Sequence, residues 1–175
     1  MAKENNVSLD ALERTAGEMK REPAKAKRTN RVEGTWNLGE GRPQFTSEMS
    51  FEGGKLILEA DQPTFLGGGG TRPGPMHYAL FGFVSCFTAT FATVAAMEGV
   101  KLDEVKAAAE FDLDFSKVFG IAELPIVEEV RIALKVKSDV GQDRVIELLR
   151  EAEARCPASY CLENPIRLVA RLETE

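Results

Sequence analysis

Residues 76–97 read MHYALFGFVSCFTATFATVAAM, and this run contains no acidic residue, no lysine and no arginine. Its length approaches that of a helix that spans a bilayer. The run is, however, rich in alanine, threonine, serine and glycine, and it lies between amphipathic segments that are typical of soluble proteins. We therefore interpret it as a helix buried in a protein core, and we expect no membrane partner.

On a helical projection this run divides into two stripes. One stripe contains only small side chains: Ala79, Gly82, Cys86, Ala89, Thr93 and Ala96. The other contains bulky side chains: Leu80, Val84, Phe87, Phe91 and Val94. The bulky stripe can cover a sheet, whereas the small stripe allows a second helix to approach closely. Because the chain offers only one other convincing core helix, the sequence predicts that a second copy covers the small stripe, in a homodimer.

The segments before this helix predict an extension followed by a small sheet. Residues 1–28 carry apolar side chains at rough helical spacing, so we expect an N-terminal helical extension. Between residues 29 and 61, short apolar runs separated by glycine-containing turns predict a three-stranded antiparallel meander. The glycine run at 67–70 lacks the Gly-Lys-Ser/Thr ending of a phosphate-binding loop. We expect a flexible loop there, which ends at a proline-marked helix start.

Two alternating segments and a second helix follow the apolar run. Residues 105–115 and 130–137 alternate apolar and polar side chains, which predicts an antiparallel hairpin with one acidic and one basic outer face. Ser138 or Asp139 is expected to cap a helix that ends near Arg155, and residues 166–172 alternate like a last strand. The predicted order is β-β-β-α-β-β-α-β, an α+β fold in which helices pack on a mostly antiparallel sheet.

The composition fits one globular domain and disfavours several functional classes. The chain has 175 residues, of which 43% are hydrophobic, and a net charge of −6. Because the chain is acidic, we expect no nucleic-acid partner. The polar residues after Met1 give no secretory signal pattern, and three cysteines is an odd number, so we expect a cytoplasmic protein with free thiols. With His77 as the single histidine, we expect no metal site and no cofactor.

The cysteines allow two interpretations. Cys86 lies in the middle of the small stripe, and Cys156 points inward if the second helix continues past Arg155. The pattern gives Cys161 no such placement. Inward-facing thiols on two helices are typical of structural cysteines, which are often buried, but they are also compatible with a reactive pair. The pattern alone leaves both interpretations open.

Two short segments carry a family resemblance. Residues 72–86 read RPGPMHYALFGFVSC, with a Gly-Pro pair that opens a helix and a cysteine in its middle, and residues 154–159 read ARCPAS. Both resemble segments of the OsmC/Ohr family of osmotically inducible and organic-hydroperoxide-resistance proteins. The likeness extends from about Thr29 to Leu172. It implies a single OsmC-like domain over residues 29–175, with two central helices packed together in an intertwined homodimer.

The resemblance also implies a thiol peroxidase site at the subunit interface, which would serve in the defence against oxidative stress. Cys86 would be the peroxidatic thiolate that attacks an organic hydroperoxide substrate. Cys156 would be the resolving thiol that condenses with the sulfenic acid to form a disulfide. A dithiol reductant such as a lipoyl protein would then reduce that disulfide.

The start of the apolar helix departs from the family pattern. The family usually has a glutamate there, which orients an arginine from the early strands, whereas this chain has Met76 and His77. We expect His77 to contribute to the electrostatics of the site in place of the glutamate. The candidate arginines are Arg31, Arg42 and Arg72, and we favour Arg42. The missing glutamate keeps an alternative open, a non-catalytic protein of this fold that binds a small apolar or acyl ligand in the interface pocket.

Overall fold

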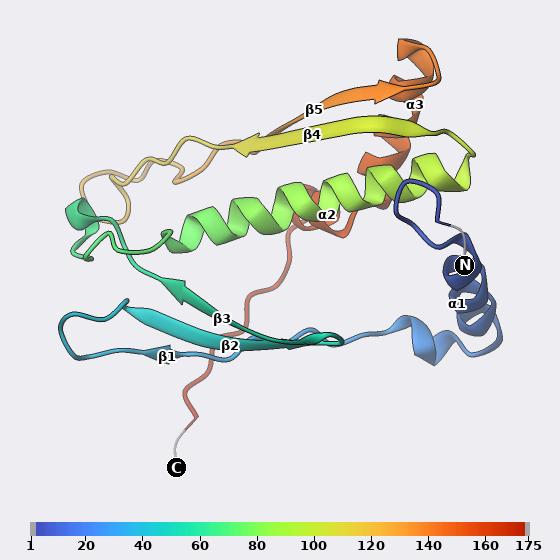
Figure 1. Ribbon diagram of the computed structural model, residues 1–175. Coiled ribbons are helices and arrows are strands. Elements are labelled where there is room, and N and C mark those ends of the chain that lie inside the picture. Colours follow the sequence, from blue (N-terminus) through green and yellow to red (C-terminus); the bar gives the residue numbers. More distant parts are fainter. Residues whose placement is uncertain (1–2, 174–175) are drawn as a thin grey trace. The chain divides into compact units, whose positions relative to one another are not determined.

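The computed structural model describes residues 3–173, and the chain divides into two compact units. One unit consists of Met1–Leu9 together with Gly82–Glu175, and the other of Asp10–Phe81. Helix α2 (Pro75–Met97) is a single continuous helix (Figure 1). It belongs to both units, because the division falls between Phe81 and Gly82. The apolar run of the sequence is therefore one continuous helix, as predicted.

The unit Asp10–Phe81 contains the predicted meander. Its three strands pair antiparallel in the order β1-β2-β3, and a two-residue turn at Glu52 and Gly53 connects β2 to β3. Helix α1 lies within residues 1–28, where the sequence predicted a helical extension. The elements of this unit are α1 (Leu9–Arg21), the 3-10 helix η1 (Pro23–Ala26), β1 (Thr35–Trp36), β2 (Phe45–Phe51), β3 (Gly54–Ala60) and the 3-10 helix η2 (Thr64–Leu66).

The glycine run is held by Asp61 and is not the flexible loop that we expected. The buried Asp61 carboxylate accepts hydrogen bonds from the N–H groups of Thr71 (3.0 Å) and Gly69 (3.2 Å) and from the Thr71 hydroxyl (2.8 Å). The hydrogen bond from the Thr71 N–H lowers the pKa of Asp61 most, and the bond from the Thr71 hydroxyl lowers it further. The chain also turns back closely on itself, since a Cβ on Gly68 would lie 1.9 Å from the carbonyl oxygen of Gln62. Glycine is thus required for the close approach of the two backbones.

Helix α2 begins at Pro75, as the sequence predicted, because a proline at the first helical position loses no hydrogen bond. Its first turn is attached to β3 through Glu59. The Tyr78 hydroxyl donates to the Glu59 carbonyl oxygen (2.6 Å), and Arg72 Nε donates to Glu59 Oε2 (2.6 Å). One residue of the sheet therefore fixes both the loop before the helix and the helix itself.

The unit that contains Gly82–Glu175, called the second unit below, packs two helices against a hairpin. The buried core joins Phe91 and Val94 of α2 to Leu148 and Ala152 of α3, and side chains of both strands pack against this core. Phe87 is buried as well, so the bulky stripe of α2 faces the core as predicted. The elements of this unit besides α2 are β4 (Leu102–Glu110), β5 (Arg131–Ser138), α3 (Gln142–Arg155) and α4 (Pro157–Glu163).

The hairpin of β4 and β5 is antiparallel and carries the expected opposite charges. Lys137 pairs with Glu104 (2.7 Å) and Arg131 pairs with Glu110 (3.0 Å) across the two strands. The first strand ends at Glu110, not at residue 115 as predicted. The partner strand begins only at Arg131, which is opposite Glu110, so the backbone of residues 111–115 has no strand to pair with.

The caps and the last strand were predicted incorrectly. Helix α3 begins after Gly141, because Ser138 donates to the Val140 carbonyl oxygen (3.2 Å) and the Asp139 carboxylate accepts the Lys101 N–H (3.2 Å). Residues 166–172 form no strand, and within the described residues 3–173 no other segment pairs with them. Alternation favours a strand only where a partner edge is available. The structure therefore holds a three-stranded and a two-stranded antiparallel sheet, and the fold class is α+β.

The N-terminal residues contribute to this second unit. The side-chain amide of Asn5 donates to the Val100 carbonyl oxygen (2.8 Å) and accepts the Leu102 N–H (2.9 Å), so it satisfies the backbone between α2 and β4.

Helix α2 is long and apolar enough to cross a bilayer. A single helix of this kind is weak evidence for a membrane protein, because core helices of soluble proteins have the same length and composition.

Candidate redox site

Two free thiols from distant parts of the chain meet in the second unit. The sulfur atoms of Cys86 and Cys156 lie 3.9 Å apart. Cys86 projects from the middle of α2 and is partly exposed, whereas Cys156 is 1% exposed. The structure thus brings together the two cysteines that the family resemblance singled out.

The backbone around Pro157 places the second thiol. Cys156 is both the C-cap of α3 and the N-cap of α4, and its backbone is extended (φ −76°, ψ 124°). A residue before proline is disfavoured in the helical conformation, so α3 ends at Arg155. Our expectation that this helix runs on through Cys156 was therefore wrong, although the side chain does point inward as predicted.

Hydrogen bonds favour the charged form of Cys156. Burial alone would raise the pKa of this thiol, but the N–H groups of Ser159 and Ala158 and the hydroxyls of Ser159 and Thr90 donate to its sulfur. These donors outweigh the burial, and the pKa of Cys156 falls below its usual range. Cys156 is therefore the more acidic thiol of the pair.

The other thiol is shifted in the opposite direction. Burial raises the pKa of Cys86, and the neighbouring charge of Cys156 raises it further, although the Ala158 N–H also donates to this sulfur. Two adjacent sulfurs cannot both be charged at low cost, so the pair carries one negative charge before both are ionised. When the pair holds a single negative charge, these opposite shifts favour its location on Cys156.

The thiol pair lies in apolar surroundings. Phe87, Cys156 and Ala158 form one buried cluster, and further side chains packed against it come from α2, β5 and α3. These are Phe83, Cys86, Ile132, Leu134 and Leu149. Such a lining accommodates the hydrocarbon part of an organic molecule and offers few groups that compete for the thiol proton.

Sequence analysis did not identify two residues of this site. Thr90 lies one helical turn after Cys86, and its hydroxyl donates to the Cys86 carbonyl oxygen (3.0 Å). The same hydroxyl also contributes to the lowered pKa of Cys156. The buried Ser159 was hidden because α4 was not predicted. The spacing of four residues between Cys86 and Thr90 was a usable signal, since such residues lie on one helix face.

The proposed electrostatic residues are in the other unit. His77 is exposed at the start of α2, and it precedes Cys86 by nine residues. A helix rises about 1.5 Å per residue, so nine residues correspond to about 13 Å along the helix axis. Arg42 precedes β2 and lines a cavity of about 570 Å³ together with Asn37, Thr46 and Glu59.

The other two candidate arginines already have carboxylate partners. Arg31 pairs with Glu33 on the exposed segment before β1, and Arg72 pairs with Glu59. Arg72 lies in the loop before α2 and is held there by a carboxylate of β3. All three candidate arginines belong to the unit Asp10–Phe81, whereas both thiols belong to the other unit.

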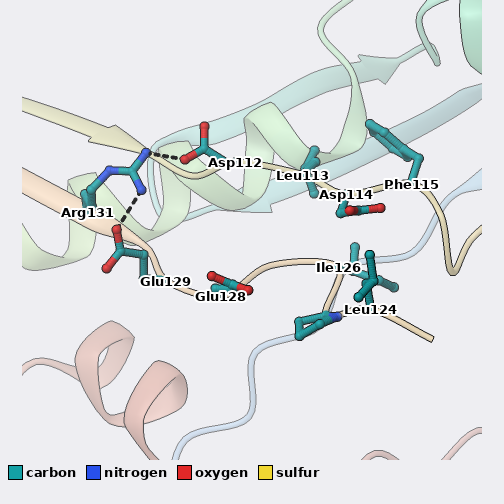
Figure 2. A pocket seen from close by; sticks show the side chains of 10 residues that line it. Asp112, Leu113, Asp114, Phe115, Leu124, Ile126, Glu128, Glu129 and Arg131 are labelled. Atoms are coloured by element: carbon teal, nitrogen blue, oxygen red, sulfur yellow. Dashed lines mark hydrogen bonds and ion pairs between the residues drawn. The ribbon is translucent and has the colours of Figure 1, made fainter. Parts of the chain in front are cut away.

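A further cavity, of about 640 Å³, lies beyond the paired part of β4 and β5 (Figure 2). Asp112, Asp114, Glu128 and Glu129 line it, and Arg131 binds Asp112 (2.8 Å) and Glu129 (2.7 Å) at its edge. No cysteine lines this cavity. Among the described residues, no group of three or more His, Cys, Asp or Glu side chains has the arrangement of a metal site.

A comparison with sequence models of protein families shows which family the chain belongs to. A sequence model of the OsmC-like protein family matches residues 67–170, which is more than half of the chain. The chain belongs to the OsmC/Ohr family. The matched region contains both Cys86 and Cys156 and every element from α2 to α4.

Solved structures share the OsmC fold at low sequence identity. An OsmC-like protein from Mycoplasma pneumoniae is 15% identical with a TM-score of 0.59, and the match covers 78% of this chain and 89% of that one. An organic hydroperoxide resistance protein OsmC from Legionella pneumophila is 22% identical with a TM-score of 0.52, and the match covers 76% and 89%. No curated protein matches the chain. The structural matches establish the fold of this OsmC-family protein.

Proposed function

We propose that this OsmC-family protein reduces organic hydroperoxides with Cys86 and Cys156. The observation that carries the proposal is the 3.9 Å contact between two free thiols whose pKa values are shifted in opposite directions. The apolar lining supports an organic substrate, and the similar protein from L. pneumophila is an organic hydroperoxide resistance protein. A cytoplasmic location, where thiols stay reduced, fits the free cysteines.

The first step oxidises Cys86, because it is the more exposed sulfur of the two. The Cys156 thiolate accepts the proton of Cys86, and the Cys86 sulfur attacks the outer oxygen of the hydroperoxide. The O–O bond breaks, and its electron pair leaves on the alkoxide, which takes the proton from Cys156. The products are an alcohol, a sulfenic acid on Cys86 and a regenerated thiolate on Cys156.

The second step closes the disulfide. The Cys156 thiolate attacks the Cys86 sulfur, the S–S bond forms, and hydroxide leaves and becomes water after protonation. The sulfurs must approach from 3.9 Å to about 2 Å, which side-chain rotation can accomplish when the Cα atoms are suitably placed. In total, two thiols and one hydroperoxide give one disulfide, one alcohol and one water. An external dithiol then restores the thiols.

The proposal includes a homodimer, because the small stripe of α2 is partly uncovered in the single chain. Gly82 and Ala89 are exposed, and a Cβ on Gly82 would meet no atom within 4 Å. Only 28% of an apolar 18-residue stretch of α2 is buried. The unpaired, alternating residues 166–172, with Leu168 and Leu172 about nine-tenths exposed, offer a strand to a second copy. A role of His77 or Arg42 at the thiols would then be exerted across the dimer interface.

Single-turnover oxidation with cumene hydroperoxide tests the assignment of roles. We expect the reduced protein to consume one equivalent and to yield a Cys86–Cys156 disulfide in peptide maps. The Cys156→Ser variant should stop at a sulfenic acid on Cys86, which dimedone traps, whereas Cys86→Ser should consume no hydroperoxide. Consumption by Cys86→Ser would reverse the roles. Tight binding without consumption in the unmodified protein would favour the non-catalytic alternative, a protein that holds an apolar or acyl ligand.

A further inference from the structure

The third cysteine lies on α4, five residues after Cys156, and is more accessible than the other two. Cys161 is exposed on α4, whereas Cys156 is 1% exposed and Cys86 is partly buried. A disulfide between Cys86 and Cys156 would therefore offer little sulfur surface to a reductant. Access is one of the factors that set the rate of thiol–disulfide exchange.

Helix α4 places Cys161 one turn away from the residue that packs near Cys86. Ala158, in the first turn of α4, belongs to the buried cluster against which Cys86 packs. Cys161 follows Ala158 by three residues, and residues at this spacing lie on the same face of a helix. Cys86 thus packs at the start of α4, where Cys156 and Ala158 lie, and Cys161 follows one turn further along the same helix. Consistently, the charge of Cys161 contributes to the raised pKa of Cys86.

We propose that Cys161 is a third redox thiol, which takes the disulfide over from Cys156 and presents it to the reductant at the surface. The proposal rests on the disulfide between Cys86 and Cys156 that is part of the proposed function. It assigns an exchange site to an exposed cysteine on α4, and the partner of that site is a small dithiol or a dithiol-bearing protein.

The exchange step is balanced without any oxidant. The Cys161 thiolate attacks the Cys86 sulfur, a bond forms between Cys161 and Cys86, and the electron pair of the broken bond leaves on Cys156 as a thiolate. The more acidic thiol is the better leaving group, and the donors from Ser159, Ala158 and Thr90 stabilise the departing Cys156 thiolate. A direct bond between Cys156 and Cys161 is disfavoured, because five residues of an intact helix separate Cα atoms by more than about 7 Å.

The reductant then acts at the surface. One thiolate of an external dithiol attacks the exposed Cys161 sulfur, and Cys86 leaves and takes the proton of the second thiol. That second thiolate attacks the mixed disulfide and releases Cys161. The dithiol ends as a disulfide, and the protein regains its three thiols.

The test forms the disulfide without any hydroperoxide, so that it does not depend on peroxidase activity. Diamide oxidises the protein, the reaction is stopped by acid at successive times, and peptide maps identify the disulfides. Dihydrolipoamide then reduces the oxidised protein in a separate rate measurement. The variants are Cys161→Ser and, as a matched control on α4, Leu162→Ser, which introduces the same serine at a neighbouring exposed position.

We expect a Cys86–Cys156 disulfide to form first and a Cys86–Cys161 disulfide to follow in the unmodified protein and in Leu162→Ser. Cys161→Ser should retain the first disulfide and be reduced at least about tenfold more slowly. Equal reduction rates for the unmodified protein and Cys161→Ser, or peptide maps without any Cys86–Cys161 disulfide, would overturn the proposal. If hydroperoxide fails to oxidise the protein while these diamide results hold, the proposed function fails and the exchange site stands.

Discussion

Replacement of Ser159 by alanine should raise the pKa of Cys156. The substitution removes one hydroxyl donor from the sulfur and leaves the N–H groups of Ser159 and Ala158 in place. A hydrogen bond to a charged group contributes about 1.5–3 kcal/mol, and we use the lower end because other donors remain. One pKa unit corresponds to ~1.4 kcal/mol, so the pKa of Cys156 should rise by about one unit.

The same substitution should change the reaction rate and the pH dependence of stability. At pH values below the pKa of Cys156 in both the unmodified protein and Ser159→Ala, the substitution lowers the fraction of Cys156 thiolate about tenfold. The more basic thiolate is about threefold more nucleophilic, so disulfide formation should slow about threefold. Because folding lowers the pKa of Cys156, its thiolate stabilises the folded state above the ordinary thiol pKa. This stabilisation is lost as the pH falls through the folded-state pKa. The substitution should therefore cost more stability at alkaline than at acidic pH.

Site-resolved alkylation measures this shift directly. The rate of iodoacetamide modification of Cys156 is followed by mass spectrometry across pH, and its midpoint gives the pKa. Ser138→Ala is the matched control, because that hydroxyl donates to the Val140 carbonyl oxygen and should leave the midpoint unchanged. An unchanged midpoint in Ser159→Ala would show that the hydroxyl does not stabilise a thiolate, and would refute our explanation of the acidic Cys156.

Three further substitutions test the packing that supports the site. Gly82→Leu should weaken the proposed dimer, and light scattering should show a larger monomer fraction; a chain that is monomeric without the substitution would contradict the interface. Leu148→Ala should lower the free energy of unfolding by about 2–5 kcal/mol in urea titrations, because this side chain is fully buried in the core. Gly68→Ala should destabilise the loop, since its Cβ would clash with the Gln62 carbonyl oxygen, and faster proteolysis between β3 and α2 should reveal it.

Patterns of side chains within one segment predicted most elements of this fold. The apolar run predicted α2, apolar runs between glycine-containing turns predicted the meander of β1, β2 and β3, and alternation predicted β4 and β5. These predictions succeed because burial of one face is a property of the segment itself. The same rule failed for residues 166–172, where alternation is present but no strand edge is available among the described residues. Strand formation depends on the partner as much as on the segment.

Local competition for hydrogen bonds explains the errors at the ends of elements. Ser138 and Asp139 are good cap residues, yet their side chains bond to Val140 and Lys101, and Gly141 precedes the helix instead. Cys156 lies in extended backbone because Pro157 follows it, and this single proline both ends α3 and starts α4. The sequence contained that proline, but α4, with seven residues, was too short to show a helical period of apolar side chains.

The chemistry of the thiol pair could be predicted from the sequence only in part. The family resemblance named Cys86 and Cys156, but not which of them is the more acidic. That property depends on donors from α4 and from Thr90, which converge on Cys156 only in three dimensions. Exposure favours oxidation of Cys86, and hydrogen bonding favours ionisation of Cys156. The two requirements are compatible because the sulfurs are in contact, so the buried thiolate can first accept the proton of its exposed neighbour and then attack it.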